Sequence, residues 1–124
     1  MQEQLFFNID STEGGIDREL APGITTTIFP GEQAMLSIVR FEANAAGTLH
    51  HHPEEQWGYC LSGSGVRFQG DDEVPVKPGD FWRTPGELPH TMQAGDGGMV
   101  VIDIFAPPRK AYTKAGSGFA MSEE

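Results

Sequence analysis

The stretch GTLHHHPEEQWGYCLSG, residues 47–63, decides the fold prediction because it sets three consecutive histidines in front of an alternating apolar run. His50 and His52 stand two positions apart. In an extended strand this spacing points both imidazoles to the same face, as two ligands of one metal ion require. His51 is expected to point the other way, toward the surface or behind the ligands.

The fourth and last histidine, His90, closes a second stretch, GDFWRTPGELPH, at residues 79–90. Proline and glycine punctuate this stretch, so a new strand is expected to begin at its end. All the histidines of the chain therefore fall within two motifs. This concentration favours metal binding over a solvated surface cluster.

The bulk composition indicates one small domain that binds a small molecule. The chain has 124 residues, and its 18 acidic against 8 basic residues give a net charge of -10. This charge disfavours nucleic acid and anionic membranes as partners. The single cysteine, Cys60, excludes an internal disulfide, and neither a secretory leader nor an apolar run of membrane-spanning length is visible. We therefore expect a cytoplasmic protein.

Short β-strands separated by tight turns are predicted throughout, since 16 glycines and 9 prolines punctuate alternating or β-branched runs. Reversals are expected at 62–65, 70–72 and 78–79. An antiparallel sheet that folds back this often must hide its edges, as a double-sheet jelly roll does, with the functional site at the mouth of the barrel. The expected strands are 24–29, 34–41, 47–52, 56–61, 65–69, 74–76, 80–84, 90–94 and 99–105.

The ends of the chain are predicted to lie outside this barrel. Residues 1–20 are expected to form an N-terminal arm or a first edge strand, and residues 21–110 the barrel. Residues 111–124 form a C-terminal extension. The Gly/Ser/Lys-rich tail from residue 110 onward is expected to be loose or to contact a partner.

The two histidine stretches resemble the two motifs of the cupin superfamily, which implies an all-β double-stranded β-helix, or jelly-roll barrel, in a single domain. The second match departs from the family pattern at Glu87, where glycine is usual, and at Ala94, where asparagine is frequent. These positions shape a turn and the rim, so the fold expectation stands.

Carried over residue by residue, the resemblance implies a divalent transition metal held by His50, His52, Gln56 and His90. Gln56 occupies the place where most cupins have glutamate. Three neutral imidazoles and a neutral amide leave the ion its full charge, which suits the polarisation of a carbonyl or enol oxygen. Ligand types alone are compatible with Ni, Zn, Fe, Mn or Cu.

A narrower resemblance joins HHHPEEQ and VIDIFAPPRKAY, residues 50–56 and 101–112, to small cupins of pectin degradation. These KdgF-like proteins linearise 4,5-unsaturated uronates. The resemblance implies that Asp103, Phe105 and Arg109 face the pocket. Strand alternation separately places Val101, Asp103 and Phe105 on one face.

Asp103 is a candidate general acid/base, because an inward carboxylate is costly unless it is paired or catalytic. A nearby cation would lower its pKa and burial would raise it. The alternative is that Asp103 pairs with Arg40 or Arg109 and only stabilises the barrel. Arg109 is either a carboxylate anchor or a surface residue, and Arg40, Arg67 or Arg83 can also supply positive charge.

The remaining conspicuous side chains are expected to be structural. The aromatic residues Trp57, Tyr59, Phe81 and Trp82 alternate along strands and fit a core or a dimer interface. Cys60 shares the inward parity of Gln56, which fits a small buried apolar residue, although a thiol near the metal stays an alternative.

The favoured function is therefore a metal-dependent isomerase or lyase that opens or tautomerises an unsaturated uronate, or a similar enolisable carbonyl compound. The expected partners are an anionic sugar acid and a second copy of the chain in a homodimer. The alternatives are a metal-dependent oxygenase or lyase of another small molecule, and a metal- or ligand-binding protein without catalysis.

Overall fold

The computed structural model describes residues 3–114 and 116–120. Within them the chain forms seven strands and one short 3-10 helix. Their bounds are β1 Ile16–Ala21, β2 Ile24–Pro30, β3 Met35–Phe41, β4 Glu55–Gln69, β5 Asp72–Val76, β6 Phe81–Thr84, β7 His90–Ala106 and η1 Lys110–Thr113. None of the described helices is long and apolar enough to cross a membrane. The architecture confirms the prediction of an all-β fold.

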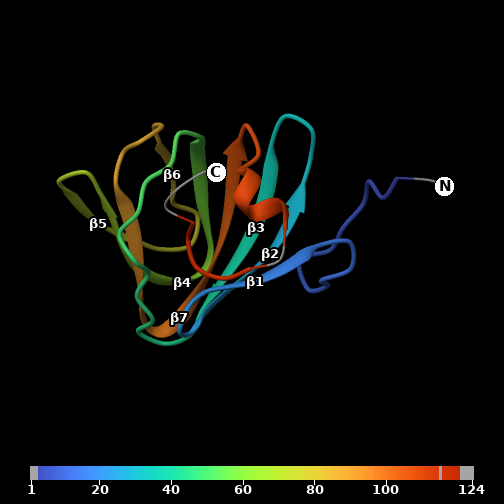
Figure 1. Ribbon diagram of the computed structural model, residues 1–124. Helices are drawn as coiled ribbons and strands as arrows, with labels where there is room; N and C mark the ends of the chain where they lie inside the picture. The colour runs from blue at the N-terminus through green and yellow to red at the C-terminus, as the bar shows by residue number, and fades with distance from the viewer. Residues whose placement is uncertain (1–2, 115, 121–124) are drawn as a thin grey trace.

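All strand pairs in the sheet are antiparallel, in the order β1-β2-β3-β7-β4-β5, with β6 pairing with β4. The strands β4 and β7 are far longer than the others, and Figure 1 shows them curving from one half of the barrel into the other. One half contains β1, β2, β3 and β6. The other contains β5, so the two long strands wrap the sheet around an interior.

The long strands bend at glycines rather than reversing there. The register of the β4–β7 pair shifts between Cys60 and Ser62 and again between Gly63 and Gly65. Gly63 has φ 76°, and a Cβ built on it would lie 2.1 Å from the carbonyl oxygen of Gly98. Such bulges re-aim a strand without ending it. The predicted reversal at 62–65 is therefore wrong, whereas turns at 70–72 and 78–79 do separate β4, β5 and β6.

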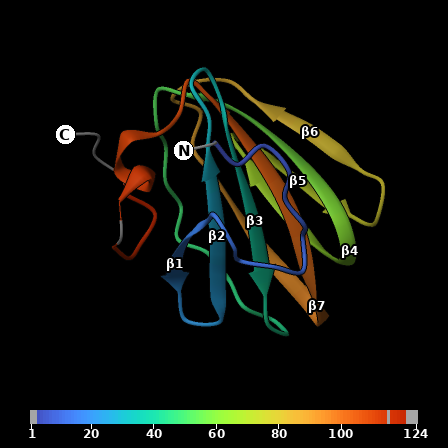
Figure 2. The ribbon, with the colours of Figure 1, turned by 90° about the vertical axis from the view of Figure 1, so that its right-hand side faces the viewer.

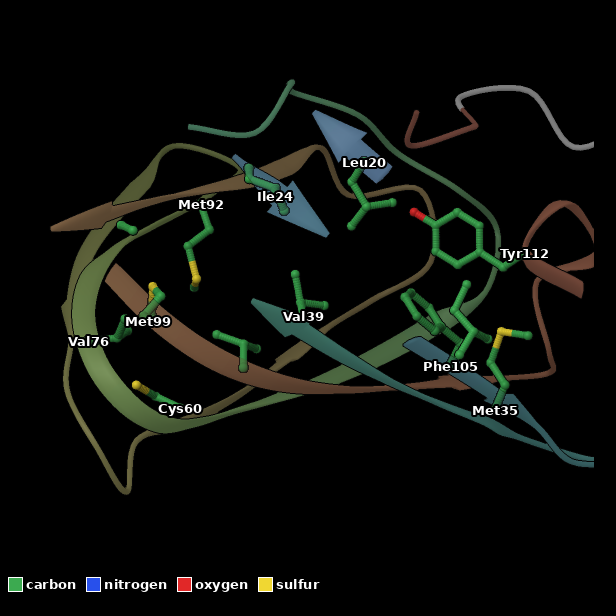
Figure 3. Packing of buried hydrophobic residues seen from close by; sticks show 13 residues of the cluster. Leu20, Ile24, Met35, Val39, Cys60, Val76, Met92, Met99, Phe105 and Tyr112 are labelled. Atoms are coloured by element: carbon green, nitrogen blue, oxygen red, sulfur yellow. The ribbon is translucent and has the colours of Figure 1, made fainter. Parts of the chain in front are cut away.

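The interior is filled by apolar side chains from both halves, as Figure 3 shows. Met92, Met99 and Val76 fill one end. Phe105 and Tyr112 pack edge to face at the other end, with ring centroids 5.7 Å apart. Cys60 is fully buried, and its Sγ contacts the carbonyl oxygens of Ser62 and Gly63, both at 3.6 Å.

The segment that carries the three histidines is extended but is not a strand, so the prediction for 47–52 is wrong in part. It pairs with β7 through two isolated bridges, Ala46 with Gln93 and His50 with His90, rather than through a continuous ladder. The backbones of His50 and His90 donate to each other's carbonyl oxygens, at 3.1 and 2.9 Å. This reciprocal pair fixes one motif against the other.

Both chain ends pack onto the sheet. The strand β1 pairs with β2, and the N-terminal residues before it run along the outside of β2 and β3, where Phe7 contacts Phe29 with ring centroids 5.0 Å apart (Figure 2). After η1 the chain returns to β1, where Gly118 donates to the carbonyl oxygen of Glu19 at 2.8 Å. The expected loose tail is therefore docked over residues 116–120, while 115 and 121–124 lie outside the described residues.

Candidate metal centre

The imidazoles of His50, His52 and His90 converge inside the barrel. One nitrogen of each ring lies within 4.8 Å of the corresponding nitrogens of the other two, and all three residues are buried. His51 is exposed and pairs with Glu87 at 2.9 Å instead. The alternation predicted from the i, i+2 spacing is confirmed, even though the segment is not a regular strand.

Backbone carbonyl groups orient all three rings in the same way. The Nδ1 atoms of His50, His52 and His90 lie 2.6, 3.1 and 2.8 Å from the carbonyl oxygens of Thr48, Glu54 and Leu88, each two residues away. An Nδ1–H that donates to a carbonyl leaves the Nε2 lone pair for a metal ion, as in most histidine metal sites. His90 Nε2 is buried and has no hydrogen-bond partner in the described part of the chain.

The contact between His52 and Gln56 also fits a bound cation. His52 Nε2 lies 3.0 Å from Gln56 Oε1, while its Nδ1 faces the carbonyl oxygen of Glu54. A neutral imidazole has one N–H, so it cannot donate to both oxygens. A cation shared by Nε2 and Oε1 resolves this conflict. The chain therefore carries a site for one divalent transition metal.

Burial keeps these ligands in the neutral form that binds metal. It lowers the pKa of His50 to about 4 and that of His90 to about 2, and the nearby positive charges of Arg109 and Arg67 lower them further. Both rings are therefore uncharged at neutral pH, with their lone pairs available to a cation.

Asp103 lies on the inner face of β7, between Ser37 of β3 and Gly58 of β4. It lines the same narrow cavity of about 40 Å³ as His50, His90 and Gln56. Its carboxylate bonds to the Gln56 side chain, but Oδ1 is buried without a partner among the described residues. Burial raises the pKa of Asp103 to about 6, against the opposing effect of Arg67.

Arg109 is fully buried behind the cavity rather than at its surface. Its guanidinium stacks on Tyr112, 4.2 Å from the ring centroid, and donates to the carbonyl oxygens of Phe119 and Ala120, at 2.8 and 2.5 Å. Its Nε is 3.8 Å from Glu54, whose carboxylate lies 3.5 Å from His52 Nδ1. Arg109 therefore lies next to the Glu54 carboxylate that contacts His52, and it also fixes the C-terminal segment through Phe119 and Ala120.

That C-terminal segment covers the histidines. The ring of Phe119 stacks on His50, with centroids 4.4 Å apart and planes at 25°. Arg18 of β1 adds three bonds to the same part of the chain, donating to the carbonyl oxygens of Ala111, Ser117 and Gly118. Two buried arginines thus tie down the segment that closes this side of the cavity.

Of the other three arginines considered from the sequence, only Arg67 lines the cavity. Arg40 donates to the carbonyl oxygen of Ile9 in the N-terminal segment, and Arg83 forms an exposed pair with Glu55 at 3.5 Å. Neither lines the cavity, whereas Arg67 is buried on the inner side. Asp103 forms no ion pair with Arg40 or Arg109 within the described residues.

Of the four aromatic residues that alternate along strands, Trp82 packs against the core. The other three, Trp57, Tyr59 and Phe81, are exposed on the outer face. Cys60 is not part of the histidine cluster, and burial raises its thiol pKa, so the structural interpretation of this residue is confirmed.

Comparison with known proteins assigns the family. The profile described as "Cupin domain" matches residues 37–105, more than half of the chain. The chain is a cupin. Its fold is the cupin jelly-roll barrel, as an RmlC-like cupin from Shewanella frigidimarina NCIMB 400 illustrates, with a TM-score of 0.76 at 20% identity over 90% of this chain and 96% of that one.

Two further relatives bear on function. The structure of KdgF from Halomonas sp. matches with a TM-score of 0.76 and 27% identity, over 89% of this cupin and 98% of the KdgF chain. Oxalate decarboxylase OxdC from Bacillus subtilis (strain 168) is 31% identical over 99 residues, which span 75% of this cupin. The match covers only 25% of the decarboxylase, so this cupin corresponds to a fraction of that protein.

Several site residues were missed from the sequence. Glu54 behind His52, Trp82 beside Arg67 and Phe119 over His50 gave no signal, because their neighbours in space are distant in the chain or lie in an irregular loop. Arg67 was one of three interchangeable candidates. Simple alternation along β4 does not place Arg67 on the same face as Gln56, because the register of β4 shifts between residues 60 and 65.

Proposed function

We propose that this cupin is a metal-dependent isomerase or lyase that opens or tautomerises an unsaturated uronate or a similar enolisable carbonyl compound. The observation that carries the proposal is the cluster of three histidines beside Asp103: His50, His90 and Asp103 line one cavity, and Oδ1 of Asp103 has no hydrogen-bond partner among the described residues. The match to KdgF over nearly the full length of both chains supports the uronate as substrate class.

The metal site supplies the electrophile of this mechanism. When bound, a divalent ion withdraws electrons from a carbonyl or enol oxygen of the substrate. His50, His52 and His90 are its ligands, and we assign Gln56 as the fourth because its oxygen already faces His52 Nε2. A neutral amide cancels none of the ion's charge, so its Lewis acidity stays high.

Asp103 moves the proton in this proposal. A pKa raised to about 6 by burial lets one carboxyl group both accept and return a proton near neutral pH. The small side chain of Ser37 lines the same cavity and pairs in register with Asp103 across β3 and β7. The group takes a proton from the substrate hydroxyl and delivers one to carbon as the enol becomes a ketone.

Phe105 and Arg109 shape the site. The Phe105 ring lies 5.5 Å from that of His52 and forms an apolar wall that excludes water. Arg109 lies behind it, 5.7 Å from the ring centroid. In this proposal Arg109 anchors a substrate carboxylate, which requires exchange of its hydrogen bonds to Phe119 and Ala120 for bonds to the substrate.

The test follows the conjugated-alkene absorbance of a 4,5-unsaturated uronate with metal-loaded protein. The wild type is expected to accelerate its loss, and Asp103→Asn to lower kcat by about 10²–10⁴-fold with metal content unchanged. Asp96→Asn, an exposed acid of the same strand, is the matched control. Loss at the spontaneous rate with metal supplied would remove this substrate class.

A second candidate is a decarboxylase or oxygenase of another small carboxylic acid, which the similarity to oxalate decarboxylase favours. Release of CO₂ from oxalate by manganese-loaded protein, or Fe(II)-dependent oxygen uptake, would support it. A third is binding without turnover, in which Asp103→Ala leaves ligand affinity and the cellular readout intact.

We also propose a homodimer in the cytoplasm. The outer face of the sheet exposes large apolar side chains from three adjacent strands, which is unusual for a free surface. Light scattering coupled to gel filtration is expected to give twice the 13.5 kDa chain mass. The single buried cysteine is compatible with a reducing compartment. The exposed outer residues are Trp57, Tyr59, Leu61, Phe81 and Ile104.

A further inference from the structure

Arg67 is a buried cation that has no carboxylate partner among the described residues. Only 6% of its surface is exposed. Its Nε donates to Gln69 Oε1 at 3.2 Å and its Nη2 to Thr84 Oγ1 at 2.9 Å, and both acceptors are neutral. Among the described residues, no further hydrogen bond of this guanidinium is seen.

A buried charge without an opposite partner is costly, so a counter-charge is expected from elsewhere. The other two buried arginines differ from Arg67 in their partners. Arg109 lies beside the carboxylate of Glu54, and Arg18, which likewise has no acidic partner among the described residues, donates to three backbone carbonyl groups that hold the C-terminal segment. Asp103 is near enough for its charge to be felt by Arg67 but forms no ion pair with it within 4.0 Å.

The surroundings of Arg67 hold its guanidinium in one orientation. Thr84 Oγ1, which accepts from Arg67, itself donates to Gln69 Oε1 at 2.6 Å. The amide nitrogen of Gln69 donates to the backbone carbonyl of Arg83 at 2.8 Å, so this hydrogen-bonded ring is tied to β6. The indole of Trp82 packs against the guanidinium, 5.5 Å from its ring centroid. A preorganised fork of this kind loses little entropy when it binds an anion.

Arg67 lies at the border of two spaces. It lines the narrow cavity that His50, His90 and Asp103 also line, and an open pocket of about 440 Å³ between β5 and β6. Trp82 lines this second pocket, and its Nε1–H is buried without a partner in the described part of the chain. Arg67 therefore stands between the two spaces, with the histidines on the side of the first.

We propose that Arg67 binds a carboxylate group of the small-molecule ligand and thereby directs the rest of that molecule toward the three histidines. For a ligand with a single carboxylate, this inference gives the anchoring role to Arg67 in place of Arg109, because binding at Arg67 needs no displacement of the C-terminal segment that Arg109 holds. A planar carboxylate matches the guanidinium fork better than a tetrahedral anion does. The binding of a carboxylate by Arg67 stands by itself. The further statement that this ligand is the substrate rests on the proposed function.

The experiment measures binding of D-glucuronate to the full-length chain by calorimetry, with zinc loaded and again after chelation. Arg67→Met is expected to weaken binding at least about tenfold in both states, because a charged hydrogen-bonding partner is lost. Arg83→Met, an exposed arginine on the adjacent strand, is expected to leave the affinity unchanged. D-Glucose, which lacks the carboxylate, is expected not to compete.

Unchanged glucuronate affinity in Arg67→Met, or tighter binding of inorganic phosphate than of glucuronate, would overturn the assignment. If Arg67→Met does not fold, the wild type still decides: the Arg67 Nε–H resonance, assigned with Arg67→Lys, must shift on saturation with glucuronate. No shift refutes the proposal. Arg67-dependent binding without turnover of an uronate would refute the proposed function and leave this inference standing.

Discussion

Replacement of Gly58 by alanine tests the close approach of β4 to the indole of Trp82, which packs beside Arg67. A Cβ on Gly58 would lie 2.3 Å from Trp82 Nε1, 2.5 Å from Cε2 and 2.7 Å from Cζ2. All three atoms belong to one rigid indole, so the whole ring must move. Such overpacking costs about 1–3 kcal/mol.

The expected change in melting temperature follows from chain length. At about 2.1 cal/mol/K per residue, unfolding of the 124-residue chain has an entropy of about 0.26 kcal/mol/K. The Gly58→Ala variant should therefore melt about 4–12 °C below the wild type. Thermal unfolding followed by circular dichroism measures this shift.

Two controls isolate the contact with the indole. Gly97→Ala lies on β7 with no atom within 4 Å of the added Cβ, and its cost should stay within about 0.5 kcal/mol. In a Trp82→Phe background, the shorter ring should make room, so Gly58→Ala should cost less than half as much there. If Gly58→Ala destabilises the protein no more than Gly97→Ala does, the close contact between Gly58 and the Trp82 indole is incorrect.

Three further expectations concern the metal and its flanking turn. Chelation should lower the melting temperature by about 10 °C when free metal had stood at 100 times its Kd, because ligand binding then contributes about 2.7 kcal/mol, and re-addition of metal should reverse the shift. His51→Ala should keep one bound metal per chain by elemental analysis while His52→Ala loses it, and equal losses would contradict the observed orientation of the two rings. Glu87→Gly should gain about 0.5–1 kcal/mol in urea unfolding, since Glu87 has φ 67° and a left-handed backbone disfavours a residue with a Cβ; a loss of stability would show that the His51 contact outweighs the strain.

The departure at Glu87 shows how far a motif can be interpreted without coordinates. The sequence comparison identified a residue where cupins usually have glycine, and the structure supplies the reason, because this turn needs a positive φ. The side chain of Glu87 in turn contacts His51 at 2.9 Å. The motif therefore located the turn correctly, but not this contact.

Strand boundaries were predicted less well than strand content. Glycines at 62–65 were interpreted as a reversal, yet β4 continues through them to Gln69. The same glycine conformations serve a hairpin or a bulge, and only the partner strand decides between them. Here the partner is β7, which approaches Gly63 too closely for any side chain.

The sequence by itself determined the all-β class, the inward direction of His50 and His52, and the shared face of Asp103 and Phe105. These follow from alternation, which is a local property of an extended chain. The motif resemblance predicted that His90 joins His50, and the tertiary structure shows the backbone pair that brings them together. Only the tertiary structure showed that Arg109 lies beside an acid and that Arg67 does not. Charge pairing inside a barrel depends on residues far apart in the chain, and no local pattern records it.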